Sequence, residues 1–207
     1  MENFDRKKHW EKIYQTKELT QVSWFQPSPK TSIDLIAKAA LSKDAKIIDV
    51  GGGDSFLVDH LLDLGYVDIT VLDISNSAIE RAKNRLGDRA KLIKWIISDI
   101  TEFSPSEKYD CWHDRAAFHF LTDEIEIAQY VKTVNTSIRE KGHLIIGTFS
   151  EKGPEKCSGI AIKQYTESNL EKLFSNIFIK VECSTVDHKT PFNTTQSFIF
   201  CSFIKKA

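Results

Sequence analysis

Residues 46–55 have the sequence KIIDVGGGDS, and the fold can be worked out from this stretch. A short apolar run ends at three consecutive glycines, a pattern typical of a strand that is buried on both faces and stops at a tight turn. Residues 55–64 then place apolar side chains at helical spacing, and Gly65 predicts the end of that helix. The sequence therefore predicts a strand, a turn and a helix in direct succession.

This strand and helix unit repeats along the chain. Residues 67–73 (VDITVLD) predict a second strand, and the spacing of Ser77 and Glu80 predicts a capping box that starts a second helix. A later helix is expected to start near Asp123 and to include Ile138. Further strands are predicted at residues 92–99, 109–114 and 143–149.

The end of the chain has a different pattern. After a loop at residues 150–158, Thr166 predicts the start of a short helix. Residues 178–186 and 197–204 then predict an antiparallel pair of strands. Alternating strands and helices with short connections indicate a mostly parallel sheet with helices on both faces, which is a doubly wound α/β fold. We expect one domain over residues 1–207.

The composition is that of an ordinary globular protein. The 207 residues are 41% hydrophobic and 28% charged, which excludes a disordered or collagen-like chain. The 28 Lys and Arg residues nearly balance the 29 Asp and Glu residues, so no strong overall field attracts the protein to nucleic acid or to an anionic membrane. No run is apolar over the roughly 18 residues that a membrane-spanning helix needs. The N-terminus lacks the apolar segment of a secretory signal.

The four cysteines are widely spaced and form no metal-binding or redox motif. This spacing favours a reducing, cytoplasmic location. Cys183 and Cys201 can meet across the terminal hairpin, but each lies in an apolar strand pattern, so we expect buried free thiols. Cys157 lies in the loop after the fifth strand, and its thiol is not expected to act as a nucleophile.

Three acidic or glycine-rich positions follow successive predicted strands. Gly51 and Gly53 lie at the first strand-to-helix turn, where a ligand can come close to the backbone. Asp73 ends the second strand at the spacing where a carboxylate binds both ribose hydroxyls. Asp99 and Ile100 follow the third strand and are placed to flank a base. Together they predict a nucleoside site, although glycine triplets also mark ordinary turns and Asp is often only a helix cap.

Two other nucleotide motifs are absent from this turn. Phe56 stands where the dinucleotide fingerprint would have its last glycine, so this turn is not suited to bind a pyrophosphate. No Gly-Lys-Ser/Thr follows the glycines, so the phosphate-binding loop of a phosphoryl-transfer enzyme is missing too.

The sequence resembles the class I S-adenosylmethionine-dependent methyltransferases through DVGGGDS at 49–55, Asp73, and SDI at 98–100. The resemblance covers residues 46–149. It implies a Rossmann-like seven-stranded sheet whose last strand is antiparallel, S-adenosyl-L-methionine as cofactor, and methyl transfer as the reaction. Ser55 departs from the family pattern, which often keeps a third glycine there.

The resemblance also implies roles for individual residues. In the family, the glycine loop approaches the methionine part of the cofactor, an acidic residue before it helps to place the ammonium group, and the later positions hold the ribose and adenine. The positions implied for cofactor binding are Asp49, Gly51, Gly53, Asp73, Ile74, Asp99 and Ile100.

Polar side chains after the fourth strand form the predicted acceptor end of the site. His113 or His119 is a candidate to accept a proton from the nucleophile, and Asp114 is a candidate to orient an imidazole or to bind a cationic acceptor. Arg115 is a candidate for acceptor binding. The alternative for each histidine is a structural side chain beside a capped helix.

The first 30 residues have many aromatic side chains and precede the core at residues 31–207. Trp10, Tyr14 and Trp24 predict a lid that covers the cofactor and acceptor, although Trp10 can equally be a helix residue packed on the sheet. Tyr165 is the candidate for the opposite wall, beyond the long loop after the fifth strand.

The sequence lacks features that are typical of methyltransferases acting on nucleic acid. The Asn/Asp-Pro-Pro-Tyr motif of enzymes that methylate nucleic acid is missing after the fourth strand, and the charge is balanced. We therefore expect a small-molecule acceptor. A protein lysine is the alternative, because WEKIY at 10–14 and SWFQ at 23–26 also resemble compact protein-lysine methyltransferases. A non-catalytic module that binds adenosylmethionine is the second alternative.

Overall fold

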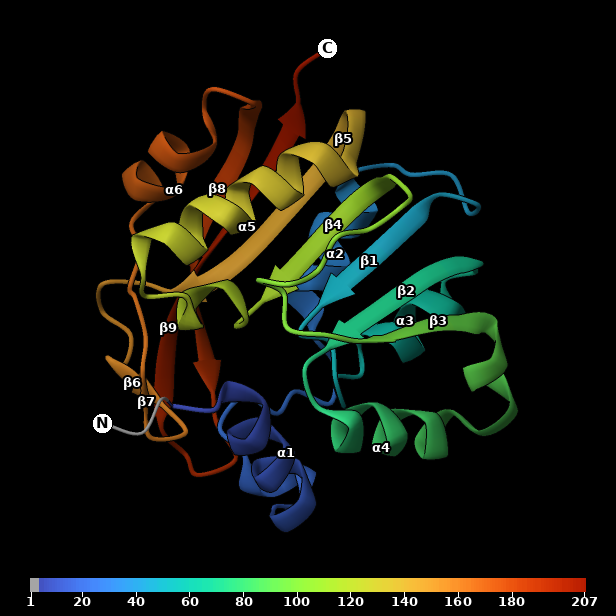
Figure 1. The fold of residues 1–207 in the computed structure, drawn as a ribbon, viewed down its shortest axis with the longest axis vertical. Helices are drawn as coiled ribbons and strands as arrows, with labels where there is room; N and C mark the ends of the chain where they lie inside the picture. Colours follow the sequence, from blue (N-terminus) through green and yellow to red (C-terminus); the bar gives the residue numbers. More distant parts are fainter. Residues whose placement is uncertain (1–3) are drawn as a thin grey trace.

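The computed structural model describes residues 4–207, and its centre is a seven-stranded sheet in the order β3-β2-β1-β4-β5-β9-β8 (Figure 1). β1 to β5 run parallel, β9 pairs antiparallel with β5, and β8 pairs antiparallel with β9. The doubly wound sheet with an antiparallel last strand is thus confirmed. The strands are β1 Lys46–Val50, β2 Asp68–Asp73, β3 Ile93–Ile97, β4 Tyr109–Arg115, β5 Ile138–Phe149, β8 Phe178–Lys189 and β9 Thr195–Lys205.

Helices cover both faces of the sheet. On one face α5 and α6 pack through apolar side chains that include Tyr130 and Phe174. On the other face α2, α3 and α4 pack through residues that include Ile36, Leu61 and Ile79. The helices are α1 Arg6–Thr16, α2 Lys30–Lys38, α3 Leu57–Asp63, α4 Asn76–Leu86, α5 Glu124–Ser137 and α6 Glu167–Phe174, with short 3-10 turns η1 Leu19–Gln21, η2 Gly87–Leu92 and η3 Phe118–Phe120.

The strand order reverses at β1 and β4, which lie side by side at the centre of the sheet. β2 and β3 follow on one side of β1, and β5 follows on the other side of β4. The last four residues of β1 are buried, as expected of a strand with helices on both faces. Such a reversal leaves a crevice at the carboxyl ends of the strands, and α1 lies across this end of the sheet in Figure 1.

Several predicted element boundaries were wrong. Ser75, not Ser77, caps α4, and its side chain accepts a hydrogen bond from the Ala78 N–H. Ser77 and Glu80 lie inside the helix, so their spacing does not mark its start. Ile138 begins β5 rather than ending α5, because its backbone is already extended. The loop after β5 also contains a small hairpin, β6 Lys156–Cys157 and β7 Ile160–Ala161, that was not predicted.

The expectation of free thiols in the terminal hairpin was also wrong. Cys183 and Cys201 lie directly opposite each other in the β8 and β9 register and form a disulfide bond. Cys111 and Cys157 are buried free thiols. The cytoplasmic location was predicted from the wide spacing of the cysteines, and it stays a prediction. Within residues 4–207 the structure contains no helix with the length and apolar character needed to cross a bilayer.

Candidate active site

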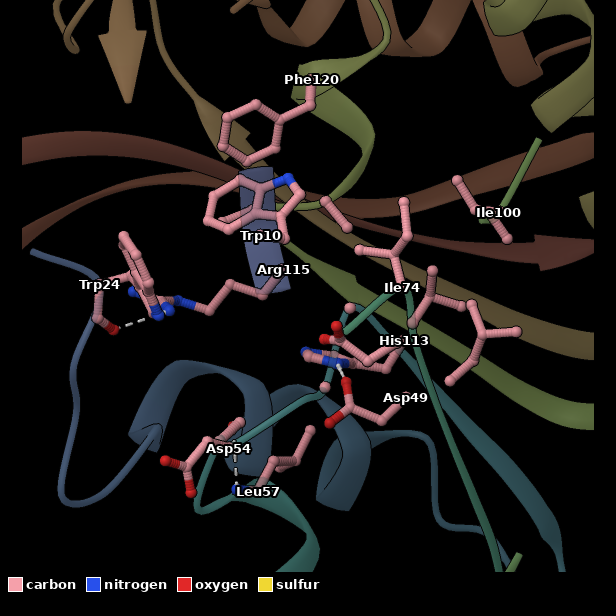
Figure 2. Close-up of a pocket in the computed structure, with 18 of the residues that line it drawn as sticks. Trp10, Trp24, Asp49, Asp54, Leu57, Ile74, Ile100, His113, Arg115 and Phe120 are labelled. Atoms are coloured by element: carbon pink, nitrogen blue, oxygen red, sulfur yellow. Dashed lines mark hydrogen bonds and ion pairs between the residues drawn. The ribbon is translucent and has the colours of Figure 1, made fainter. Parts of the chain in front are cut away.

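A cavity lies at the carboxyl ends of the parallel strands, beneath α1 and the segment that follows it (Figure 2). Its lining combines side chains from α1, from the loops after β1 to β4, and from the 22–32 segment. Most of the predicted site residues contribute to it. Those in the lining are Trp10, Tyr14, Trp24, Asp49, Gly51, Asp73, Ile74, Asp99, Ile100, His113 and Arg115.

The glycine loop has no room for side chains because it packs closely against Ala117 and Asp73. Gly51 and Gly53 have positive φ angles of 67° and 37°, which side chains rarely adopt. A Cβ at Gly51 would lie 2.6 Å from the Ala117 Cβ, and one at Gly53 would lie 2.5 Å from Asp73 Oδ2. Gly53 is outside the cavity lining. The loop therefore keeps the Asp73 carboxylate close to the turn after β1.

Asp73 is a buried carboxylate at the end of β2. The Ser75 N–H donates to its Oδ1 at 2.8 Å, and no Lys, Arg or His of residues 4–207 forms an ion pair with it. Burial, followed by the nearby charge of Asp49, raises its pKa to about 7. A pair of neutral hydroxyl donors would satisfy this carboxylate without bringing a counter-charge into the cavity.

The base end of the cavity has apolar walls and an unexpected ion pair. Ile74 and Ile100 both line it, as the flanks of an adenine should. Asp99 was expected to flank the base, but its carboxylate already accepts hydrogen bonds from other groups of the protein. Arg6 donates to both of its oxygens at 3.1 and 3.2 Å, and the Thr101 N–H donates to Oδ1 at 2.9 Å. Sequence reasoning missed Arg6, which lies 93 positions from its partner.

His113 belongs to a buried chain of hydrogen bonds that also contains Asp49 and Ser32. Its Nδ1 lies 2.7 Å from Asp49 Oδ1, and its Nε2 lies 2.8 Å from Ser32 Oγ. In a neutral imidazole Nδ1–H donates to the carboxylate, so Nε2 accepts from the hydroxyl. All three residues line the cavity. Sequence reasoning missed Ser32, because nothing in the sequence brings the start of α2 next to β4.

The other two candidate catalytic residues lie behind the wall of the cavity. Asp114 is fully buried, accepts from the Ala117 and Phe118 N–H groups, and accepts from the Tyr130 hydroxyl at 2.7 Å. His119 is also fully buried, and its Nδ1 accepts from the Phe149 N–H at 3.2 Å. Both side chains therefore have the surroundings of structural groups, which was the alternative for the histidine.

Burial alters the pKa of both groups. It raises the pKa of Asp114 to about 6, and it lowers the pKa of His119 to about 3, with Arg115 adding to the second effect. A histidine that is neutral and sealed from the cavity has no route to a proton on an acceptor. Tyr165 is likewise outside the lining, because it is buried and stacks on Phe118 with the ring centroids 5.1 Å apart.

Aromatic side chains close the opposite end of the cavity. The Trp10 ring lies edge-on to Phe120 and to Trp24, with centroid distances of 4.9 and 5.7 Å. The ring centroids of Tyr14 and Trp24 are 6.3 Å apart. Trp10 is 9% exposed, so it both packs in the core and faces the cavity. We call Trp10, Tyr14, Trp24 and Phe120 the aromatic chamber.

Polar contacts hold the start and the middle of α1 over the site. Arg6 bridges Asp99 and Glu126, and its pKa is raised because these carboxylates outweigh the effect of burial. Glu11 accepts from the Ser75 hydroxyl at 2.8 Å and from the Ser77 hydroxyl at 2.5 Å. Since Ser75 caps α4, Glu11 joins α1 to the loop that follows Asp73.

The residues present fit a nucleoside cofactor with an amino-acid tail. The buried Asp73 carboxylate lacks donors that a ribose diol would supply, and the nearby Ile74 and Ile100 offer two apolar faces to a base. The glycine loop leaves no side chain between Asp49 and Asp73. Fold and site together define a class I S-adenosylmethionine-dependent methyltransferase.

Comparison with known families agrees with this class. Residues 41–196 match the family described as a methyltransferase domain, so the chain belongs to that family. Over 139 residues it is 30% identical to a malonyl-[acyl-carrier protein] O-methyltransferase from Anoxybacillus flavithermus, which covers 66% of this chain and 51% of the relative. Over 141 residues it is 28% identical to the eEF1A lysine and N-terminal methyltransferase of Mus musculus, covering 66% and 19%. The chain thus spans about half of one relative and a fifth of the other.

Solved structures share the fold at low identity. The N-methyltransferase NodS from Bradyrhizobium japonicum, in complex with S-adenosyl-L-homocysteine, superposes with a TM-score of 0.72 at 16% identity, over 98% of this chain and all of that one. The 1,6-didemethyltoxoflavin-N1-methyltransferase of Burkholderia thailandensis gives 0.69 at 16% identity, over 94% and 81%. At these identities the similarity concerns the fold alone.

Proposed function

We propose that this protein transfers a methyl group from S-adenosyl-L-methionine to a small-molecule acceptor. The observation that carries the proposal is the continuity of the cavity, which runs from Asp73 and the glycine loop into the aromatic chamber beneath α1. An acceptor held in such a covered chamber is shielded from water and placed next to the cofactor. Small molecules are the acceptors that a covered chamber admits most easily.

The proposed cofactor placement follows the chemistry of the wall. Asp73 holds the ribose, Ile74 and Ile100 enclose the adenine, and Asp49 faces the amino-acid part. The sulfonium supplies a methyl group that is already activated, so the protein mainly has to position the acceptor. The NodS structure, which shares the fold and is named as a complex with S-adenosyl-L-homocysteine, supports the choice of cofactor.

His113 is the remaining candidate for acid–base chemistry, since Asp114 and His119 lie outside the cavity. Both of its ring nitrogens are already hydrogen-bonded, so its first role in our proposal is to orient the Asp49 carboxylate. The Ser32 hydroxyl is the hydrogen-bond partner of Nε2, and the Asp49 carboxylate is the partner of Nδ1. We infer that Ser32 and His113 position Asp49 and are not needed to activate a strong nucleophile.

A protein lysine is the second candidate acceptor. The aromatic chamber favours it, because tryptophan and tyrosine faces attract ammonium groups. The mouse relative, named as a lysine and N-terminal methyltransferase, also supports it. Nucleic acid is not proposed, because the chain has no excess of positive charge. We propose one domain over residues 1–207 with residues 1–30 as its lid; residues 1–3 lie outside the described part.

The test has a binding step and a transfer step. We expect calorimetry to detect binding of S-adenosylhomocysteine by the wild type, and Asp73→Ala to weaken this binding at least tenfold, because the ribose loses its acceptors. Asp110→Ala is a matched control, since Asp110 lies at the opposite end of β4 and pairs with Arg139.

Tritiated S-adenosylmethionine is then incubated with the protein and with small-molecule or protein extracts. We expect label in the small-molecule fraction. Label in protein alone would favour the lysine alternative. Cofactor binding without any transfer would favour the non-catalytic module.

A further inference from the structure

Arg115 is the charged side chain of the aromatic chamber that has no charged partner. It is the last residue of β4, and its Nη1 donates to the Trp24 carbonyl oxygen at 3.2 Å (Figure 2). Its Nε and Nη2 are shielded from solvent and have no hydrogen-bond acceptor. Among residues 4–207, no carboxylate lies within ion-pair distance of it.

This isolation is unfavourable for a guanidinium group. Five N–H groups need acceptors, and within residues 4–207 one neutral carbonyl is the single acceptor. The Phe198 ring, 4.9 Å from the guanidinium carbon, gives partial compensation through its π face. Burial accordingly lowers the pKa of Arg115 to about 10, although Asp49 and Cys157 counteract the effect.

Of the other acidic and basic side chains that line the cavity in residues 4–207, all but Asp73 have a partner of the opposite type. Three of the four acidic groups have basic partners, and the fourth, Asp73, faces the proposed ribose site. Arg115 is thus the position where an additional charge of opposite sign would be stabilised. The pairs are Asp49 with His113, Asp54 with Arg81 and Arg85, and Asp99 with Arg6.

We propose that the methyl acceptor is an unsaturated or aromatic acid whose carboxylate pairs with Arg115. This inference rests on the proposed function, and it deepens it by naming the chemical class of the acceptor. The carboxylate takes the place of the Trp24 carbonyl as acceptor for Nη1 and reaches a second nitrogen of the same planar fork. The flat body of the acid lies against the rings of Trp10 and Phe120.

The same charge disfavours a lysine acceptor in this chamber. An ammonium group among these rings would lie close to a second cation that has no counter-ion. Two positive charges that lie close together repel strongly in a site with little water. Arg115 therefore selects against the cationic acceptor that the aromatic rings alone would suit.

The test compares acids with their neutral amides. Benzoate, phenylacetate and cinnamate, each with its carboxamide, are titrated by calorimetry into protein saturated with S-adenosylhomocysteine. We expect at least one acid to bind tenfold or more tightly than its amide in the wild type. In Arg115→Gln this preference falls to within twofold, while the affinity for S-adenosylhomocysteine changes less than threefold. Arg139→Gln, which alters an exposed arginine far from the cavity, keeps the preference.

Three results would overturn the proposal. The first is that no acid binds the wild type better than its amide, which is decisive even if Arg115→Gln does not fold. The second is that Arg115→Gln weakens S-adenosylhomocysteine binding tenfold or more, which would assign the guanidinium to the cofactor's own carboxylate. The third is an unchanged preference in the variant. Failure of S-adenosylhomocysteine to bind the wild type would instead refute the proposed function.

Discussion

Asp73 has the most demanding electrostatic position among the residues of the site. Its carboxylate is buried at the end of β2 and receives a backbone donor at 2.8 Å, yet it has no cationic partner in the described chain. The raised pKa, about 7, places its ionisation within the range of ordinary assays. In the proposed complex two ribose hydroxyls donate to the ionised carboxylate, so cofactor binding should favour loss of its proton.

We therefore expect the affinity for S-adenosylhomocysteine to rise about tenfold between pH 6 and pH 8. The sign follows from the proton balance: the free protein holds a proton on Asp73 below about pH 7, and binding must remove it. Calorimetry across this range measures the effect. Asp73→Asn binds more weakly and should lose the pH dependence. An equally steep dependence in Asp73→Asn would show that another group is responsible.

The buried His119 side chain should make the stability of the protein depend on pH. Its pKa is lowered to about 3 by burial, whereas an unfolded chain takes up this proton near pH 6.5. Unfolding below pH 6.5 therefore binds a proton, and stability falls as the pH falls. We expect urea unfolding of the wild type to lose up to about 1.4 kcal/mol per pH unit more than His119→Asn. Parallel profiles of the two proteins would contradict the assignment.

Local spacing was enough to predict some site residues and not others. Asp73 and Gly51 are predictable because the turn and the strand end that position them are read from neighbouring residues. Ser32 and Arg6 are not, because their partners lie far away in sequence and meet them only after the sheet has formed. His119 shows the opposite error, since a polar residue in an active-site loop can point into the core.

At the scale of elements, α1 determines how closed the site is. Its sequence contributes an aromatic face to the chamber, and Glu11 links it to the capped end of α4. Arg81 adds hydrogen bonds from α4 to the carbonyl oxygens of Tyr14 and Lys17, at 3.0 and 2.6 Å. α1 is thus attached to the loop that follows Asp73, the carboxylate that we propose binds the ribose.

Glu11→Ala should loosen this attachment. The loss of charge-assisted hydrogen bonds at a half-buried position is expected to cost about 1 kcal/mol. Dissociation of S-adenosylhomocysteine should then become roughly three- to tenfold faster, and amide hydrogen exchange over residues 6–16 should increase. Stopped-flow fluorescence of Trp10 and Trp24 follows the first change. Glu80→Ala, an exposed position on α4, is the control and should leave both quantities unaltered.

The number and type of the main strands were predictable because buried parallel strands are continuous apolar runs. The boundaries of the elements were less predictable, because the residue that caps a helix depends on the backbone conformation at each candidate serine. Ser75 became the cap of α4 through its extended backbone, although Ser77 and Glu80 have the expected spacing. The short β6 and β7 hairpin has no apolar pattern of its own and therefore gave no signal.

At the scale of the whole molecule, the terminal hairpin is covalently closed. Cys183 and Cys201 are separated by 18 positions, and closing a loop of this length restricts the unfolded chain by about 3 kcal/mol. We expect dithiothreitol to lower the free energy of unfolding in urea by about this amount. The double variant Cys183→Ala with Cys201→Ala should show no response to the reductant. An equal response in that variant would assign the effect elsewhere.

The sequence could not predict this bond, because apolar context does not specify the register of a hairpin. The register is set by the turn at residues 190–194, where Thr190 N–H donates to the Thr194 carbonyl at 2.9 Å. A shift of one residue would move the two cysteines to opposite faces of the sheet. The doubly wound order, in contrast, follows from the alternation of elements and from right-handed crossovers.

We propose that a nucleoside sulfonium lies across the carboxyl ends of β1 and β2 with its ribose on Asp73. A crystal structure with S-adenosylhomocysteine tests it most directly. We expect both ribose hydroxyls within hydrogen-bond distance of the Asp73 carboxylate, adenine between Ile74 and Ile100, and the sulfur directed towards the aromatic chamber. Electron density for the ligand at another place, or a ribose that contacts no oxygen of Asp73, would contradict it.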